Sequence, residues 1–423
     1  MIDCGLFQGG HFAEQQNYQP FPFDPRTLDA VFVTHAHMDH TGRIPVLVNG
    51  GYRGPVYATA ATRDLALILY EDSAEIMAED AERGGEKPLY EPEDIPRVME
   101  RFVSVDYHAS IPLAGGWRAQ FWDAGHILGS AIVELTKGKE TLIFSGDLGN
   151  EPVPILNPTE HPHQASLVVM ESTYGNRHHE DPQTRQALLK TAVTDTISRG
   201  GVLMIPSFAL ERTQELLYYF NSLRETGAIP EVPVFLDSPM AIHATEIFEN
   251  HTDLWSKQAR TEFTADDFFA FPGLRMTATR EESRTINGVP PPKVIIAGSG
   301  MMHGGRILHH AKRYLSDPNS TLLIIGYQAG GTLGRTLLSG AKHVRIHGEQ
   351  IFVRAQIKAI GAFSAHADQP RLLAWLKAID HAPKQIALVH GELDQMRALS
   401  HLISQDLHAP VALPKIGESV EVR

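Results

Sequence analysis

The chain has 423 residues, of which 43% are hydrophobic, and its formal net charge is −13 at neutral pH. This charge argues against a broad electrostatic binder of nucleic acid, because neutralisation of phosphates supplies most of the affinity of such proteins. A single cysteine, Cys4, excludes an internal disulfide and agrees with a reducing compartment. No stretch is apolar over the length that spans a bilayer, and the N-terminus lacks a basic region followed by an apolar one. We therefore expect a cytoplasmic protein of two or three domains.

A cluster of candidate metal ligands follows the first predicted strand. The run 29–34 is apolar and rich in β-forming residues, and His35, His37, Asp39 and His40 come directly after it. Imidazole nitrogens and carboxylate oxygens hold Zn²⁺ in catalytic sites, and a strand supplies a rigid base for them. The alternative is a solvated polar loop that happens to be rich in histidine. The close spacing of four ligand-type residues favours a metal site.

Two further candidate ligands come after predicted strands. His126 follows the strand-like segment 117–122, and Asp147 follows the apolar segment 141–143. Glycines flank both residues and allow the backbone to approach a ligand closely. Each residue has an ordinary alternative, because a lone histidine is often a satisfied core residue and an aspartate after glycine often forms a turn. Their order and spacing after the first cluster favour ligands.

The pattern of elements changes near residue 177. Before this point the sequence predicts strands near residues 117, 132, 142 and 167, and a long helix over 62–83 whose acidic stretch is typical of a solvated face. After it, helices are predicted over 187–198 and 211–223, and strands over 202–206, 234–237, 294–297 and 322–326. Strands separated by helices indicate βαβ units and a mostly parallel sheet. We expect an α/β domain at 178–356 inserted into a domain that comprises 1–177 and 357–423.

Taken in order, Asp3, the first cluster, His126 and Asp147 resemble the ligand series of the metallo-β-lactamase superfamily. Three further segments, 171–175, 363–368 and 388–392, are similar to motifs A, B and C of the β-CASP nucleases within that superfamily. This branch includes the endonuclease of pre-mRNA 3′-end processing and bacterial RNase J, and histidine at motif C is typical of its RNA-directed members. The resemblance implies an α/β fold, an αββα sandwich with an inserted β-CASP domain.

The resemblance also implies a reaction and a set of roles. It predicts a zinc-dependent ribonuclease, endonucleolytic or 5′-exonucleolytic, that hydrolyses single-stranded RNA with a hydroxide held between two zinc ions. The expected ligands are His35, His37 and His126 for one ion, Asp39, His40 and His390 for the other, and Asp147 as the bridge. Asp3 is expected to orient a ligand histidine, although it could be a simple turn residue.

A general acid is expected to protonate the leaving oxygen. The resemblance points to His366 held by Glu171, because a neighbouring carboxylate favours a protonated imidazole. The segment 364–368 could also be the capped start of a helix over 369–379, and the two interpretations are compatible.

Glycine-rich turns after three strands of the inserted domain are expected to contact the RNA backbone in a cleft that faces the zinc ions. Backbone N–H groups at such turns can bind anions, although tight packing is the alternative. The candidate residues are Ser207, Ser299, Gly300, Arg306, Thr332 and Arg335. His309 and His310 could join them or could lie on an ordinary helix surface.

Other interpretations of the chain are kept open. One is another hydrolase of the metallo-β-lactamase fold, acting on DNA or on a small ester, and a second is a non-catalytic RNA-binding subunit. Relatives usually begin earlier, with strands that precede residues 2–5, so we expect missing N-terminal strands and a chain that is poorly stable alone. A homodimer is possible, and no membrane partner is expected.

Overall fold

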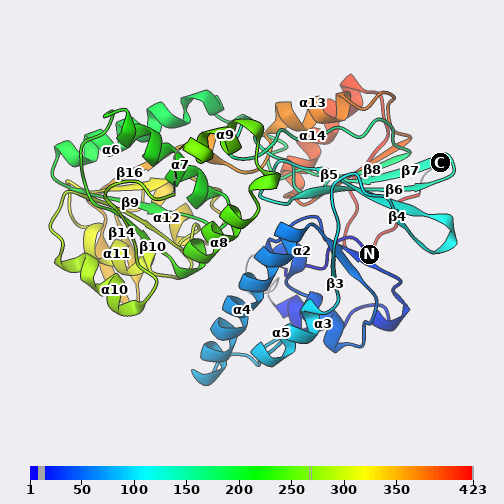
Figure 1. Ribbon diagram of the computed structural model, residues 1–423, viewed down its shortest axis with the longest axis horizontal. Coiled ribbons are helices and arrows are strands. Elements are labelled where there is room, and N and C mark those ends of the chain that lie inside the picture. The colour runs from blue at the N-terminus through cyan, green and yellow to red at the C-terminus, as the bar shows by residue number, and fades with distance from the viewer. Residues whose placement is uncertain (8–14, 266, 268, 422–423) are drawn as a thin grey trace. The chain divides into compact units, whose positions relative to one another are not determined.

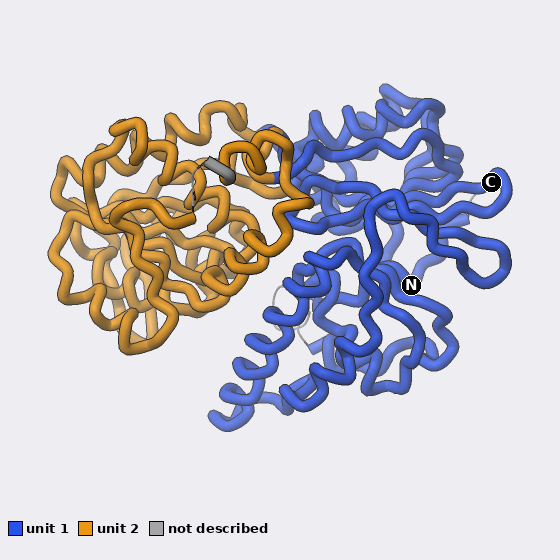
Figure 2. The backbone as a smooth tube through the Cα atoms, viewed as in Figure 1, with its two compact units in different colours: residues 1–151, 156–178, 366–423 blue, residues 152–155, 179–365 orange. Residues whose placement is uncertain are grey.

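The chain folds into two compact units. The computed structural model describes residues 1–7, 15–265, 267 and 269–421 (Figure 1). Unit 1 comprises 1–151, 156–178 and 366–423, and unit 2 comprises 152–155 and 179–365 (Figure 2). Unit 2 is therefore inserted into unit 1, as expected from the predicted fold with an inserted α/β domain.

Unit 1 contains two sheets. A three-stranded parallel sheet consists of β1 (Val31–Phe32), β2 (Val56–Ala58) and β3 (Phe102–Ser104). A seven-stranded mixed sheet has the order β18-β17-β8-β7-β6-β5-β4. Its strands are β4 (Ile111–Pro112), β5 (Arg118–Asp123), β6 (Ala131–Lys137), β7 (Glu140–Phe144), β8 (Leu167–Glu171), β17 (Gln385–Val389) and β18 (Val411–Ala412). The helices of this unit are α2 (Met38–Thr41), α3 (Ile44–Asn49), α4 (Ala60–Glu82), α5 (Ile95–Met99), α13 (Gln369–Lys377) and α14 (Leu393–Asp406).

Unit 1 has four layers, and a hydrophobic cluster fills each of the three spaces between them. Phe32 of β1 packs edge-on against Phe121 of β5, with ring centroids 6.2 Å apart, so the two sheets face each other. A second cluster joins the three-stranded sheet to the helices around α3, α4 and α5. A third joins the seven-stranded sheet to α13 and α14. Each sheet therefore buries both faces, and the order of layers is helix, sheet, sheet, helix, which confirms the predicted αββα sandwich.

Local signals explain where several elements of unit 1 begin or end. The predicted strand 29–34 is shortened to β1 because the backbone N–H of Thr34 donates to the side chain of Asp3, at 2.8 Å, instead of to a strand. Thr59 caps α4, and Asp368 caps α13 by accepting from the backbone of Arg371. The acidic half of α4 is largely exposed, as predicted.

Unit 2 is built on a six-stranded parallel sheet with the order β11-β10-β12-β9-β13-β16. Its strands are β9 (Val202–Pro206), β10 (Val234–Asp237), β11 (Leu274–Met276), β12 (Lys293–Ala297), β13 (Thr321–Ile324) and β16 (Gln356–Ala359), and β14 (His343–Ile346) and β15 (Glu349–Phe352) form a separate hairpin. The helices are α6 (Arg185–Ser198), α7 (Arg212–Glu225), α8 (Pro239–Asn250), α9 (Lys257–Ala265), α10 (Arg280–Thr285), α11 (Ile307–Tyr314) and α12 (Leu333–Leu338). Every residue of β9, β10, β12 and β13 is buried, as expected for a parallel sheet that is covered on both faces.

The structure differs from the sequence-based expectations at several places in unit 2, of which two are instructive. The expected domain boundary after residue 356 would cut β16, which pairs with β13 and so belongs to the sheet of unit 2. Helix α8 was not predicted, although Ser238 caps it and Pro239 occupies its first turn, which are both helix-start signals. Among the described residues, no helix combines the length and the apolar character that crossing a membrane requires.

Candidate metal centre

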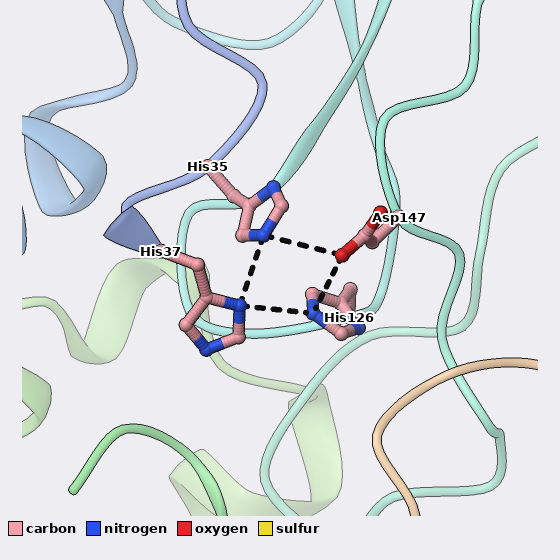
Figure 3. A group of neighbouring side chains, drawn as sticks. All are labelled: His35, His37, His126 and Asp147. Carbon is pink, nitrogen blue, oxygen red and sulfur yellow. Dashed lines mark hydrogen bonds and ion pairs between the residues drawn. The ribbon is translucent and has the colours of Figure 1, made fainter. Parts of the chain in front are cut away.

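Four ligand-type side chains of unit 1 converge at the ends of strands and loops (Figure 3). His35 and His37 follow β1, His126 lies in the loop between β5 and β6, and Asp147 follows β7. The Nε2 atom of His35 lies 3.0 Å from Nδ1 of His37 and 3.5 Å from Oδ2 of Asp147. His126 Nε2 lies 3.4 Å from His37 Nδ1 and 3.6 Å from the same carboxylate oxygen.

These distances fit a tetrahedral metal ion. Around Zn²⁺ with bonds of about 2.0–2.1 Å, the ligand atoms lie about 3.3 Å from one another. The four contacts of the group range from 3.0 to 3.6 Å. Four ligand-type atoms at these separations suit a shared cation.

A second group lies beside the first and shares one of its atoms. His40 Nε2 lies 3.3 Å from His390 Nε2, which in turn lies 3.3 Å from Oδ2 of Asp39. His40 Nε2 is also 3.5 Å from Asp147 Oδ2, the oxygen that contacts the first group. Asp147 Oδ1 is buried and has no hydrogen-bond donor among the described residues, and it lies 3.4 Å from Nδ1 of His390. A carboxylate between two ligand groups, with an oxygen that lacks a donor, is suited to bridging two cations.

Burial sets the protonation of the first group. It lowers the pKa of His35 well below the usual histidine value and the pKa of His37 to about 4. Both rings are therefore neutral at pH 7, which is the form that binds a metal. For Asp147, burial alone would raise the pKa, but the surrounding histidines, with His390 and His40 first, lower it well below its usual value. The carboxylate is consequently ionised, as a metal ligand must be.

Unusual backbone conformations present the ligands of the second group. His390 has φ of 49° and Asp3 has φ of 51°, which are left-handed values that cost energy for residues other than glycine. Asp3 Oδ2 lies 2.6 Å from Nδ1 of His40, so the carboxylate accepts the ring N–H and directs Nε2 toward His390. Gly5 lies against the carbonyl of Asp39, where an added Cβ would be only 1.6 Å from the oxygen. Only glycine fits at this position.

His366 and Glu171 lie next to the shared carboxylate. His366 Nδ1 is 3.4 Å from Glu171 Oε2 and 3.6 Å from Asp147 Oδ2. Burial alone would lower the pKa of His366, but the carboxylates of Glu171 and Asp147 outweigh it and raise the pKa above the usual value. Glu171 also accepts from the backbone N–H of Leu148 at 2.7 Å and thereby holds the loop after Asp147. A protonated imidazole at this position could donate to a reacting oxygen.

Sequence reasoning missed Thr173, which lies within motif A. Its Oγ1 lies 3.1 Å from Nδ1 of His390 and donates to the carbonyl of the same residue at 3.0 Å. These contacts fix the ring that faces Asp39 and His40. A hydroxyl two residues after a predicted functional glutamate is a weak signal, because the contact joins positions that are 217 residues apart.

The six residues expected to contact RNA lie after β9, β12 and β13 of unit 2, which are adjacent strands. Several of these side chains already have internal partners. Ser207 Oγ accepts from Thr213 Oγ1, Thr332 caps α12, and Ser299 Oγ donates to the carbonyl of Gly304. Gly300 is buried against the ring of Phe208, whereas the side chain of Arg335 is exposed. These residues therefore lie at the same ends of adjacent strands, but they differ in exposure and in how many internal hydrogen bonds their side chains make.

The remaining candidates surround Asp237 at the end of β10. Arg306 donates to Asp237 Oδ1 at 2.8 Å and to two backbone carbonyls, so its charge is already neutralised within the unit. His310 is buried with Nε2 2.7 Å from Asp237 Oδ2, and His309 stacks on His347 with ring centroids 4.8 Å apart. Arg306 and His310 therefore anchor the loop after β12, and His309 lies on the partly exposed side of α11.

Comparisons with known families cover nearly the whole chain. Residues 1–187 match a family model described as a beta-lactamase superfamily domain. Residues 213–337 match a Beta-Casp domain, and residues 350–414 match a Zn-dependent metallo-hydrolase RNA specificity domain. The three matches follow the order of segments that the sequence motifs predicted.

Curated relatives extend the same result. The chain is 39% identical, over all of its length and 94% of the relative, to a protein of Thermus thermophilus named Ribonuclease TTHA0252. It is 33% identical to a protein of Methanosarcina mazei named Transcription termination factor FttA, over 93% of this chain and 63% of the relative. A protein of Methanothermobacter thermautotrophicus with the same name is 32% identical over all of this chain and 68% of the relative.

Proposed function

Because the chain belongs to the β-CASP branch of the metallo-β-lactamase superfamily, we propose that it is a zinc-dependent ribonuclease that cleaves single-stranded RNA. The observation that carries the proposal is the convergence of two ligand groups on one shared carboxylate, that of Asp147. A match to an RNA specificity domain and the ribonuclease name of the Thermus thermophilus relative support RNA as the substrate.

Each ligand group would hold one zinc ion. The ligands are His35, His37 and His126 for one ion, Asp39, His40 and His390 for the other, and Asp147 for both. When bound, a pair of zinc ions in these two groups would lower the pKa of a water and stabilise the charge that develops on phosphate oxygens. Neutral imidazoles in the first group keep the site positive enough to accept a phosphodiester.

His366 would supply the proton that the leaving oxygen needs. Its raised pKa keeps the imidazole protonated near neutral pH, and Glu171, with Oε2 3.4 Å from Nδ1, orients the ring. An alkoxide is a poor leaving group without a proton, so general acid catalysis at this step contributes typically 10²–10⁴-fold. Glu171 would act through His366 and through the loop that carries Asp147.

Unit 2 would contribute contacts to the RNA backbone. Arg335 is the exposed cation among the six expected residues, and the turn that contains Ser299 and Gly300 ends an adjacent strand. With a net charge of −13, such contacts are local, so binding of RNA should depend less steeply on salt than that of a basic nucleic-acid binder. A cytoplasmic location and a homodimer stay predictions.

A cleavage assay tests the proposal. Wild-type protein of known zinc content is incubated with single-stranded RNA and single-stranded DNA of one sequence, labelled at either end. Asp147→Asn removes the shared charge and His366→Ala removes the acid, whereas Asp195→Asn alters an exposed ion pair with Lys358 and serves as the control. We expect RNA cleavage with about two zinc ions per chain, loss of cleavage in the first two variants, and wild-type activity in the control.

The outcomes separate the competing functions. A ladder of products from both labels would indicate internal cleavage, whereas mononucleotides released from the 5′ end would indicate exonuclease action. Two bound zinc ions with no cleavage of RNA would contradict the proposal and favour a small-ester hydrolase. Cleavage of DNA alone would exclude the RNA assignment, and a chain without affinity for zinc would favour a non-catalytic RNA-binding role.

A further inference from the structure

Thr34 lies at the meeting point of the segments that carry the candidate ligands. It directly follows the apolar run that contains β1, and only 1% of its surface is exposed. Its side chain contacts Asp3, His35 and His40, and its carbonyl accepts from the backbone N–H of Ala131 at 2.6 Å.

The hydroxyl of Thr34 determines which nitrogen of His35 carries the proton. Thr34 Oγ1 donates its single proton to Asp3 Oδ2 at 2.8 Å, because an ionised carboxylate can only accept. Its remaining lone pairs face Nδ1 of His35 at 3.1 Å. A hydroxyl oxygen that has already donated can only accept here, so Nδ1 of His35 carries a hydrogen and Nε2 does not. Nε2 is the atom that faces His37 and Asp147.

The same carboxylate determines the tautomer of His40. Asp3 Oδ2, which accepts from Thr34, lies 2.6 Å from Nδ1 of His40. Asp3 therefore holds a hydrogen on Nδ1, and Nε2 is the ring nitrogen that faces His390 and Asp147. One chain of hydrogen bonds, from His35 through Thr34 to Asp3 and His40, thus orients one ring in each ligand group.

The carbon side of Thr34 contacts the turn before Asp147. A Cβ added to Gly146 would lie 2.7 Å from Cβ and 2.9 Å from Oγ1 of Thr34, so only glycine allows this approach. Gly146 has φ of 54°, which also favours glycine. The whole side chain of Thr34 therefore packs against this turn, whereas only its hydroxyl hydrogen-bonds to His35 and Asp3.

We propose that Thr34 is a positioning residue for zinc, whose hydroxyl fixes the tautomers of His35 and, through Asp3, of His40. This inference rests on the proposed metal site. Groups that hold a metal-ligating imidazole in one orientation typically contribute 10–100-fold to metal affinity. This chain of hydrogen bonds includes one imidazole from each ligand group, so loss of the hydroxyl weakens the binding of zinc in both groups.

Zinc affinity in matched variants separates the hydroxyl from the hydrocarbon. Thr34→Val keeps the shape and removes the hydroxyl, whereas Thr34→Ser keeps the hydroxyl and removes the methyl group. Thr196→Val is the control, since Thr196 is a fully buried threonine of unit 2 whose hydroxyl is hydrogen-bonded to the carbonyl of Ala192 and to the hydroxyl of Thr321. Full-length protein is titrated with Zn²⁺ against a chromophoric chelator, which reads affinity without activity.

We expect Thr34→Val to lower the affinity for zinc at least about tenfold, while Thr34→Ser and Thr196→Val stay within about threefold of wild type. Equal affinity of Thr34→Val and wild type would overturn the inference and leave the proposed function intact. Weakening in Thr34→Ser equal to that in Thr34→Val would also overturn it, because packing would then be responsible. If wild type itself bound no zinc, the proposed function and this inference would both be wrong.

A spectroscopic measurement keeps the inference testable if Thr34→Val does not fold. Wild-type protein labelled with ¹⁵N-histidine and freed of metal is compared with His35→Gln, so that the signals lost in the variant identify His35. We expect the Nδ1–H tautomer for this ring. An Nε2–H tautomer would contradict the hydrogen-bond directions and overturn the inference.

Discussion

Arg185 forms an ion pair with Glu215 inside unit 2, with 3.1 Å between Nη1 and Oε1 and no exposed surface on either side chain. Glu215 also pairs with Arg212, and the two arginines donate to the carbonyls of Ala362 and Phe363. The buried carboxylate of Glu215 therefore neutralises the two arginines that hold the segment 362–363 near the end of unit 2.

Replacing Glu215 by glutamine should destabilise the protein strongly. The change removes the carboxylate charge that both buried guanidinium groups share, and removal of one partner of a buried pair costs about 3–5 kcal/mol. Chemical denaturation followed by circular dichroism measures the loss. Asp195→Asn, which removes the exposed partner of Lys358, should cost less than about 1 kcal/mol. Similar losses in the two variants would show that the buried cluster has no special role.

The pH dependence of stability should carry a contribution from Asp123. Burial raises the pKa of this carboxyl to about 7, in spite of hydrogen bonds from the Gly125 backbone and Asn157. The folded state therefore holds a proton that the unfolded state releases near pH 4, so stability should fall as pH rises from 4 to 7 and level off above 7. The difference between the two pKa values corresponds to at most about 4 kcal/mol.

Asp123→Asn should remove this contribution. Urea denaturation at several pH values is the measurement, and the quantity compared is the change in the free energy of unfolding between pH 4 and pH 7. We expect a smaller decrease in the variant than in wild type. An identical pH profile for the two proteins would show that Asp123 titrates normally.

His366→Ala should have an effect that depends on the leaving group. RNA cleavage requires a proton on an alkoxide, so kcat should fall about 10²–10⁴-fold. A phosphodiester with a p-nitrophenolate leaving group needs no such proton, so its cleavage should fall much less. Zinc content should not change, because His366 belongs to neither ligand group. Equal losses on both substrates would exclude His366 as the acid.

Gly5→Ala should impair the second ligand group by steric overlap. The added Cβ would lie 1.6 Å from the carbonyl oxygen of Asp39 and 2.5 Å from the backbone nitrogen of His40. We expect zinc stoichiometry to fall below two and thermal stability to decrease. Gly288→Ala is the matched control, because an added Cβ there meets no atom within 4 Å. Normal zinc content in Gly5→Ala would contradict the close contact.

The sequence reveals much of this architecture because strands and ligands are ordered along it. Strands β9 and β10 were predicted with their observed bounds, since apolar runs between helices leave few alternatives. His126 and Asp147 could be identified as candidates because each follows a strand beside a glycine. Signals of this kind lie within a few neighbouring residues, so the sequence alone shows them.

Contacts between distant positions could not be read in the same way. Arg306 follows a glycine-rich turn, which suggested a phosphate ligand, but it pairs with Asp237, which lies 69 residues away. The shortened β1 depends on a hydrogen bond between Asp3 and Thr34, which are 31 residues apart. In both cases the folded backbone brings the two residues together, and neither composition nor periodicity of the sequence indicates that they are in contact.

The single oxygen that joins the two ligand groups makes their occupancies interdependent. Asp147 Oδ2 lies 3.5 Å from His35 of one group and 3.5 Å from His40 of the other. An ion bound in either group orients this carboxylate and displaces protons from its neighbours, so it alters the affinity of the other group by a factor that is the same in both directions. The two loading steps are therefore coupled, and partial depletion should yield half-loaded molecules in a proportion that differs from the statistical one.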